Sequence, residues 1–151
     1  MLKRFARFSL AISKIDRCWH KLAADEMAKY ELNSPHAVYL TTLYDFEDGI
    51  TAAKLGKLCG KNKADVSRMV AVLEKKGLVY KEKTGLNRYR AKLLLTEEGK
   101  QAAQYIQHRA ALAVELAGSG VSEAEREVFY RCLEKITANL LALSKEGLPQ
   151  A

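Results

Sequence analysis

Residues 50–79 carry the pattern that decides the fold, ITAAKLGKLCGKNKADVSRMVAVLEKKGLV. Apolar residues recur at helical spacing on both sides of Gly60, which predicts one short helix over residues 51–59 and a second over residues 63–76. Two short helices joined at a glycine are typical of a helix-turn-helix.

The packing expected at the junction supports this interpretation. Leu55 and Cys59 of the first helix face inward, and Gly56 is small enough for a close crossing of the two helices. Val66 and Met69 cover the junction from the second helix. All five residues therefore have a place in one small core.

The ends of both helices carry recognisable signals. Thr51 and Asn62 are the expected N-caps, and Asp65 lies where a third-position side chain can reach back to the second cap. Gly77 follows the second helix, where a left-handed residue ends many helices.

A β-hairpin is predicted directly after the second helix. Residues 78–80 and 89–95 alternate with the period of strands and flank the turn residues Thr84-Gly85-Leu86-Asn87. Lys83 and Arg88 lie at its tip. A hairpin at this place is the wing of a winged helix, and its basic tip suits a polyanion.

Four further helices are predicted on either side of this segment. They are expected from Phe5 to about Tyr30, from Pro35 to Asp48-Gly49, from Glu97 to about Ala117, and from a capping box at Ser122 to Gly147. Ser34 and Thr96 are the expected N-caps of the second and third of these.

The predicted fold is therefore mainly α with a small β-hairpin wing, a winged helix-turn-helix with six helices. The 151 residues suit a single domain. Residues 34–96 are expected to form one lobe that holds the helix-turn-helix and the wing, flanked by the terminal helices of residues 1–33 and 97–147.

Charge supports a polyanion partner. The chain has 25 Lys and Arg against 18 Asp and Glu, a net charge of +7, and a pI near 9.3. Between Thr51 and Lys92, 12 basic residues face 3 acidic ones, so this segment carries +9 and the remainder −2. A basic middle on a near-neutral scaffold favours nucleic acid, although a merely solvated basic surface remains an alternative.

A helix fits the major groove of B-DNA, where base edges differ in donors and acceptors. The exposed residues expected at the front of the second helix are Asn62, Lys63, Ala64, Asp65, Ser67 and Arg68. Phosphate and wing contacts are expected from Thr51, Lys54, Lys57, Lys61, Lys81, Lys83, Arg88 and Arg90.

The terminal helices indicate association because their apolar stripes are long for a chain of this size. The residues expected at a dimer interface are Phe5, Phe8, Ile12, Phe129, Leu133, Ile136, Leu140 and Leu143. A dimer doubles the phosphate contacts and sets the spacing of two half-sites. The alternative is that the stripes close a monomeric core.

The quoted stretch, a basic hairpin and LLLTEEGK at residues 93–100 together resemble the multiple antibiotic resistance regulator (MarR) family. The resemblance implies an obligate homodimer on a pseudo-palindromic operator, usually acting as a repressor. It assigns the N- and C-terminal helices, in residues 1–33 and 97–147, to the dimerisation region and residues 34–96 to the DNA-binding lobe. It also implies a small aromatic or anionic effector that releases double-stranded DNA. Many members carry Asp-x-Arg in the wing, where this chain has Asn87 and Tyr89.

Several sensor hypotheses are weaker. Cys18 has Arg17 and His20 as neighbours but lies well past the place of the family's sensing cysteine, and Cys132, like Cys59, is expected in the core. The three histidines lack ligand spacing, so neither a metal site nor another cofactor is expected. Four aromatic residues are either core or the lining of a ligand pocket: Trp19, Tyr30, Tyr39 and Tyr44.

Other classes of protein fit poorly. The chain shows no Gly-rich phosphate loop, no G-x-S-x-G and no paired His/carboxylate motif, so an enzyme is not expected. No apolar run approaches a membrane span, and a cytoplasmic protein without a membrane partner is expected. The remaining alternative is a winged-helix adaptor whose basic face binds an acidic protein.

Overall fold

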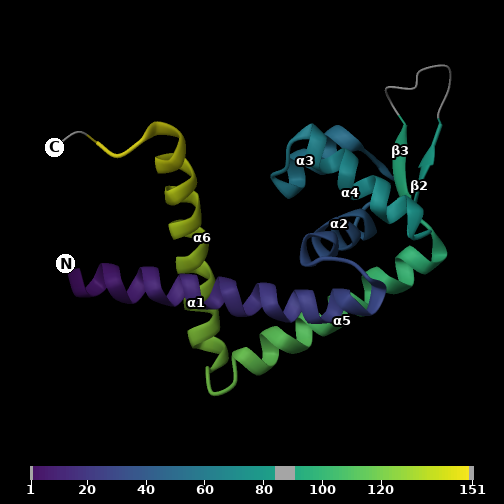
Figure 1. Cartoon of the computed structure of the whole chain (residues 1–151). Coiled ribbons are helices and arrows are strands. Elements are labelled where there is room, and N and C mark those ends of the chain that lie inside the picture. The colour runs from purple at the N-terminus through teal and green to yellow at the C-terminus, as the bar shows by residue number, and fades with distance from the viewer. Residues whose placement is uncertain (1, 84–90, 150–151) are drawn as a thin grey trace. The chain divides into compact units, whose positions relative to one another are not determined.

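The computed structural model describes residues 2–83 and 91–149, which contain six α-helices, one 3-10 helix and three strands (Figure 1). In chain order they are α1 (Leu2–Met27), η1 (Ala28–Tyr30), α2 (Ser34–Tyr44), β1 (Ile50–Thr51), α3 (Ala52–Cys59), α4 (Lys63–Lys75), β2 (Val79–Glu82), β3 (Lys92–Leu95), α5 (Glu97–Ala117) and α6 (Glu123–Glu146). The predicted mainly helical architecture with six helices is confirmed. None of these helices is long and apolar enough to cross a membrane.

The chain forms two compact units whose boundary lies inside α5. One is Met1–Ala111 and the other is Leu112–Ala151. The first unit groups α1 with the helix-turn-helix, because α1 packs on α2. The functional division into residues 34–96 and the flanking regions remains a prediction.

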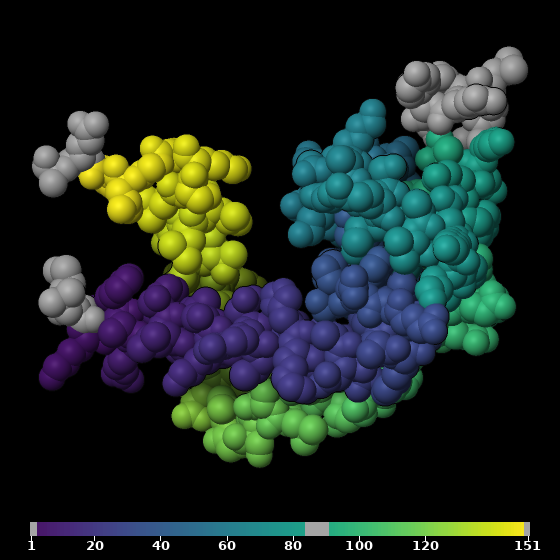
Figure 2. Space-filling view, in the orientation of Figure 1, coloured from purple at the N-terminus to yellow at the C-terminus, as the bar shows by residue number. Residues whose placement is uncertain are grey.

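The first unit has a continuous apolar core that holds α2, α3, α4, the sheet and the start of α5 together. Its largest fully buried side chains are Met27, Tyr39, Leu40, Leu43, Leu55, Leu73 and Leu93. Figure 2 shows α3, α4 and the strands as one continuous teal surface over this core.

The predicted hairpin is part of a three-stranded antiparallel sheet with the order β1-β3-β2. The hairpin prediction missed β1, in which Ile50 pairs with Leu93 of β3 and both side chains are buried. A strand of two residues has no detectable alternation, and its pairing depends on a partner about forty residues away. The sheet ties the residues before α3 to those before α5.

The start of α2 also differs from the prediction. Asn33, and not Ser34, is the N-cap: it has an extended backbone (φ −98°, ψ 158°), and its N–H donates to Nδ1 of His36 at 3.0 Å. Burial lowers the pKa of His36, whose exposed fraction is 4%. The helix ends at Tyr44, before the Asp48-Gly49 signal.

The N-terminus of α5 lies directly on the segment that follows α4. The backbone N–H of Thr96 donates to the carbonyl of Leu78 at 3.0 Å, and its hydroxyl donates to the carbonyl of Gly77 at 2.6 Å. The same hydroxyl accepts from the N–H of Gly99 at 3.0 Å, which confirms Thr96 as the cap. A Cβ on Gly99 would lie 1.9 Å from the carbonyl oxygen of Leu78, so only glycine permits this approach.

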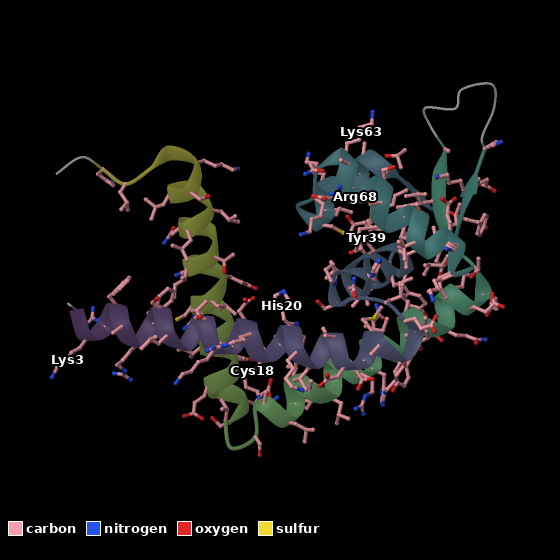
Figure 3. All side chains as sticks on the ribbon, viewed as in Figure 1. Lys3, Cys18, His20, Tyr39, Lys63 and Arg68 are labelled. Atoms are coloured by element: carbon pink, nitrogen blue, oxygen red, sulfur yellow. The ribbon has the colours of Figure 1, made fainter. Side chains whose placement is uncertain are left out.

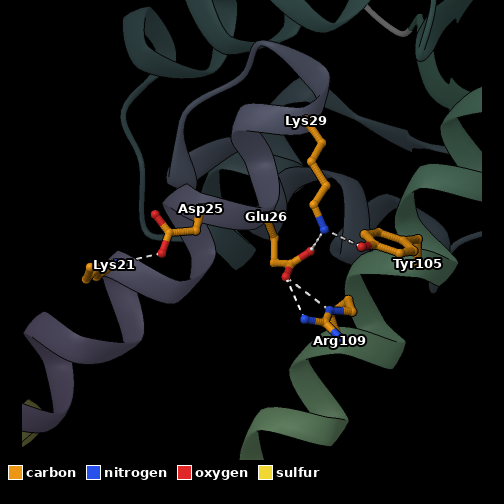
Figure 4. Close-up of polar contacts among 6 residues, drawn as sticks. All are labelled: Lys21, Asp25, Glu26, Lys29, Tyr105 and Arg109. Atoms are coloured by element: carbon orange, nitrogen blue, oxygen red, sulfur yellow. Dashed lines mark hydrogen bonds and ion pairs between the residues drawn. The ribbon is translucent and has the colours of Figure 1, made fainter.

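A polar cluster joins the end of α1 to α5 (Figure 4). The carboxylate of Glu26 accepts from Lys29 at 2.7 Å and from Arg109 at 3.0 Å, and Lys29 also reaches the hydroxyl of Tyr105. The hydrogen bonds from Lys29 and Arg109 lower the pKa of Glu26 to about 2. The cluster therefore needs an ionised Glu26.

In the second unit, α6 begins with the predicted capping box. The hydroxyl of Ser122 accepts from the N–H of Glu125, and the carboxylate of Glu125 accepts from the N–H of Ser122. Arg126 binds Glu115 through both carboxylate oxygens, at 3.1 and 2.9 Å, so α6 is tied to the end of α5.

Both terminal helices expose the apolar residues expected at a dimer interface. In α6, Leu133 is partly buried and the exposed members are Phe129, Ile136, Leu140 and Leu143. In α1, the exposed members are Phe5, Phe8 and Ile12. Cys132, expected in the core, is exposed as well.

We predict that Gly99→Ala destabilises the protein, although alanine is the better helix former. The added methyl group forces α5 away from Leu78 and weakens both bonds of Thr96, so the unfolding free energy should fall by about 1–3 kcal/mol. Chemical denaturation measures the change. Gln101→Ala, an exposed substitution in the same helix, is the control, and equal stability of the two variants would contradict the close approach.

We also predict a pH-dependent stabilisation by Glu26. Because its folded pKa lies below its unfolded value near 4.5, the stabilisation is complete above that value and is lost as the pH falls to about 2. Glu26→Gln should therefore lower the Tm at pH 7, and its difference from the unsubstituted protein should shrink between pH 4.5 and 2. Asp25→Asn, which breaks only the exposed pair with Lys21, should have little effect at either pH.

Candidate nucleic-acid interface

The helix-turn-helix forms as predicted, with Gly56 at the crossing of α3 and α4. A Cβ on Gly56 would lie 2.9 Å from Cγ2 of Val66 and 3.0 Å from the carbonyl oxygen of Lys61. Gly60 has φ +63° and ends α3, and the N–H of Lys61 returns to the carbonyl of Gly56 at 2.9 Å. Leu55 is fully buried beneath the junction, so the angle between the two helices is set by packing.

Both helices carry the predicted N-caps. The hydroxyl of Thr51 accepts from the N–H of Lys54 at 3.2 Å, and Oδ1 of Asn62 accepts from the N–H of Asp65 at 2.9 Å. The side chain of Asp65 was expected to reach back to this cap. Instead, its carboxylate forms an ion pair with Arg68, one turn further along α4.

The two faces of α4 differ sharply. Val66, Val70 and Leu73 are buried in the core. The predicted recognition residues lie on the opposite face. Asp65 is partly buried, and the other five are exposed: Asn62, Lys63, Ala64, Ser67 and Arg68. Figure 3 shows Lys63 and Arg68 among the side chains of this surface.

Lysines surround the exposed face of α4. Lys54, Lys57 and Lys61 are all exposed on α3 and the turn. The ammonium group of Lys54 lies 4.5 Å from the centre of the Phe46 ring, a cation–π contact that fixes its position. Thr51 is partly buried, and its hydroxyl is engaged as the cap.

Lys81 and Lys83, predicted to contact DNA from the wing, are both exposed. Lys81 turns back to α4, where its ammonium group lies 3.0 Å from the carboxylate of Glu74. Arg88 and Arg90 lie outside the described residues, as do the turn at 84–87 and the positions Asn87 and Tyr89. The described part of the predicted interface therefore comprises α3, the turn, the front of α4 and Lys81 and Lys83.

Tyr39 of α2 lies beneath this interface and is 1% exposed. Within the described residues its hydroxyl has no hydrogen-bond partner. Burial raises the pKa of Tyr39, and the charges of Cys59 and Asp65 raise it further. Tyr39 is therefore core, as are Tyr30 and Tyr44 at its edge, whereas Trp19 is 42% exposed.

The sensor candidates do not form a site. Cys18 is exposed on α1, and His20 binds Asp16 of the same helix at 3.2 Å. His36 is buried in the core and His108 is exposed on α5. Among the residues that the structure describes, no three His, Cys, Asp or Glu side chains are placed to hold a metal ion.

Comparison with known proteins agrees with the geometry. The model of the MarR family matches residues 30–88, from the last residue of η1 to beyond β2, a stretch that includes the helix-turn-helix. YybA, an HTH-type transcriptional regulator of Bacillus subtilis (strain 168), is 25% identical over 129 residues, which are 85% of this chain and 85% of YybA.

Solved structures share the fold over almost the whole chain. A MarR-family transcriptional regulator from Listeria monocytogenes, crystallised with a 26mer DNA, is 25% identical with a TM-score of 0.78, covering 93% of this chain and 95% of that one. MepR of S. aureus, in its DNA complex, is 21% identical with a TM-score of 0.79, covering 87% and 97%.

A helix-turn-helix followed by an antiparallel sheet, with an exposed basic helix face, defines the class of winged-helix DNA-binding proteins. Residues 30–88 are similar to the MarR family of transcriptional regulators, and the chain shares its fold with a solved structure of that family. The matched family model and the similar solved structures are those of transcriptional regulators.

We predict that the side chain of Asn62 stabilises α4 as its N-cap, an effect on folding that can be measured without DNA. Asn62→Ala should lower the unfolding free energy by about 1 kcal/mol, because the N–H of Asp65 loses its acceptor. Asn62→Asp keeps an acceptor and should retain the stability. Denaturation curves decide, and equal losses in the two variants would mean that the side chain does not act as a cap.

Proposed function

We propose that the protein is a homodimeric repressor that binds a pseudo-palindromic operator, with one α4 in the major groove of each half-site. The observation that carries the proposal is the exposed face of α4, opposite Val66, Val70 and Leu73, within a segment of charge +9. The relatives crystallised with DNA support the same use of the fold.

Base recognition in this proposal depends on the front of α4. Arg68 is 74% exposed and can donate two hydrogen bonds to O6 and N7 of guanine, and Ser67 can bond a base or a phosphate. The exposed Lys57 and Lys61 would contact phosphates, which position the protein without selecting a sequence. Lys83, with Arg88 and Arg90 from the sequence, would extend the contact to a neighbouring groove.

The homodimer is supported by the uncovered apolar residues of α1 and α6. Phe5 is 69% exposed, Phe129 54% and Leu140 50%. Soluble monomers rarely leave such residues uncovered in continuous patches, so a second copy is the expected partner. A two-fold dimer places its two recognition helices about 34–36 Å apart, one turn of DNA.

The similarity to the MarR family supports two finer proposals. A small aromatic or anionic effector releases the DNA, as is usual in the family, and the protein acts in the cytoplasm, where its DNA is. Ligand-dependent loss of DNA binding tests the first of these.

The proposal is tested by fluorescence anisotropy on duplexes selected from random DNA and on a scrambled duplex of equal length, at two salt concentrations. We expect a preference of about 10³ or more for the selected site, with two chains bound per duplex. Equal, weak binding to both duplexes that disappears at moderate salt would contradict it and favour an adaptor for an acidic protein.

Arg68→Ala should cost about 1–3 kcal/mol at the selected site and relax the base preference there, because the bidentate contact is lost. Lys75→Ala is the matched control, since it removes an exposed positive charge at the far end of the same helix. Equal losses for Arg68→Ala on both duplexes would show that Arg68 contacts only phosphate.

A further inference from the structure

Asp65 is the one acidic residue among the recognition residues 62–68, in a segment where basic residues outnumber acidic ones 12 to 3. A carboxylate at this place opposes the approach of phosphates, so it weakens DNA binding in general. Its position in the first turn of α4 favours a negative charge through the helix dipole. A role in helix stability alone, however, does not explain why the carboxylate of Asp65 forms an ion pair with another recognition residue.

That partner is Arg68, the side chain best suited to contact a base. The carboxylate of Asp65 binds Nη2 of Arg68, and the two residues are one turn apart on the same face. A guanidinium group is planar and has five N–H donors, so a carboxylate on one edge fixes the plane and leaves other donors free. Asp65 therefore orients Arg68 before DNA arrives.

The ion pair has different consequences on different DNA. Where a guanine faces Arg68, the oriented guanidinium can bind the base without losing Asp65, and little side-chain entropy remains to be lost. Where no acceptor faces Arg68, the carboxylate stays next to phosphates with no compensating contact. The same residue thus assists one sequence and opposes the others.

We propose that Asp65 is a specificity-determining residue that acts through Arg68: it positions the guanidinium for a guanine and weakens binding to DNA that lacks one at that place. The inference rests on the proposed function, because it concerns how the operator is distinguished from other DNA.

The test compares Asp65→Asn with the unsubstituted dimer on the selected site and on the scrambled duplex. We expect affinity for the scrambled duplex to rise, and the ratio of the two affinities to fall about tenfold, which corresponds to about 1.4 kcal/mol. In the single-base preference profile, the loss should be confined to the base pair that Arg68→Ala also affects. A change confined to the stability of α4 would not move that profile.

Two further variants make the result specific. Glu74→Gln removes a carboxylate of the same helix that pairs with Lys81, and it should leave the affinity ratio unchanged. Combined with Arg68→Ala, Asp65→Asn should no longer change the base preference, because the residue through which it acts is gone.

The outcomes separate this inference from the proposed function. An unchanged ratio in Asp65→Asn, an equal change in Glu74→Gln, or an undiminished effect in the Arg68→Ala background would each overturn the role of Asp65. The proposed function itself fails only if the unsubstituted protein shows no preference between the two duplexes.

Discussion

The contact between Gly56 of α3 and Val66 of α4 is the constraint on which the interface depends. A side chain at Gly56 would meet Val66 and the carbonyl of Lys61, so the two helices can cross this closely only at a glycine. Leu55 closes the core beneath the crossing. Because the inner face of α4 is held in this way, its outer face presents a defined set of polar groups and not a mobile one.

A second close approach holds the start of α5 against the segment that follows α4. The Gly77-Leu78 segment ends α4, and its two carbonyls accept from Thr96. Gly99 allows α5 to begin against that segment. α5 is in turn tied to the end of α1 by the ionised Glu26. Within the unit that spans residues 1–111, these contacts therefore connect the recognition helix to the end of α1.

Much of this could be predicted from the sequence because the decisive signals are local. The caps Thr51, Asn62 and Thr96, and the glycines that end helices, act within four residues of themselves.

The features that the sequence does not predict depend on more distant contacts or on a choice between equal candidates. The strand β1 is one of them, because Ile50 needs a distant partner, Leu93, to become a strand. Asn33 and Ser34 are both good caps, and only the backbone angles distinguish them. Asp65 lies three residues from Asn62 on one side and three residues from Arg68 on the other. The sequence therefore fits both a contact with the cap and an ion pair with Arg68, and the structure has the ion pair. Cys132 was misplaced because an apolar stripe does not say whether its own chain or another covers it.

The central claim is that the exposed face of α4 contacts base edges in the major groove. Dimethyl sulfate footprinting of a selected duplex tests it most directly, since the reagent methylates N7 of guanine in that groove. The account predicts protected guanines in two half-sites about one helical turn apart, and loss of that protection in Arg68→Ala. Unprotected guanines on a fully bound duplex would contradict it, because binding would then involve only the phosphate backbone.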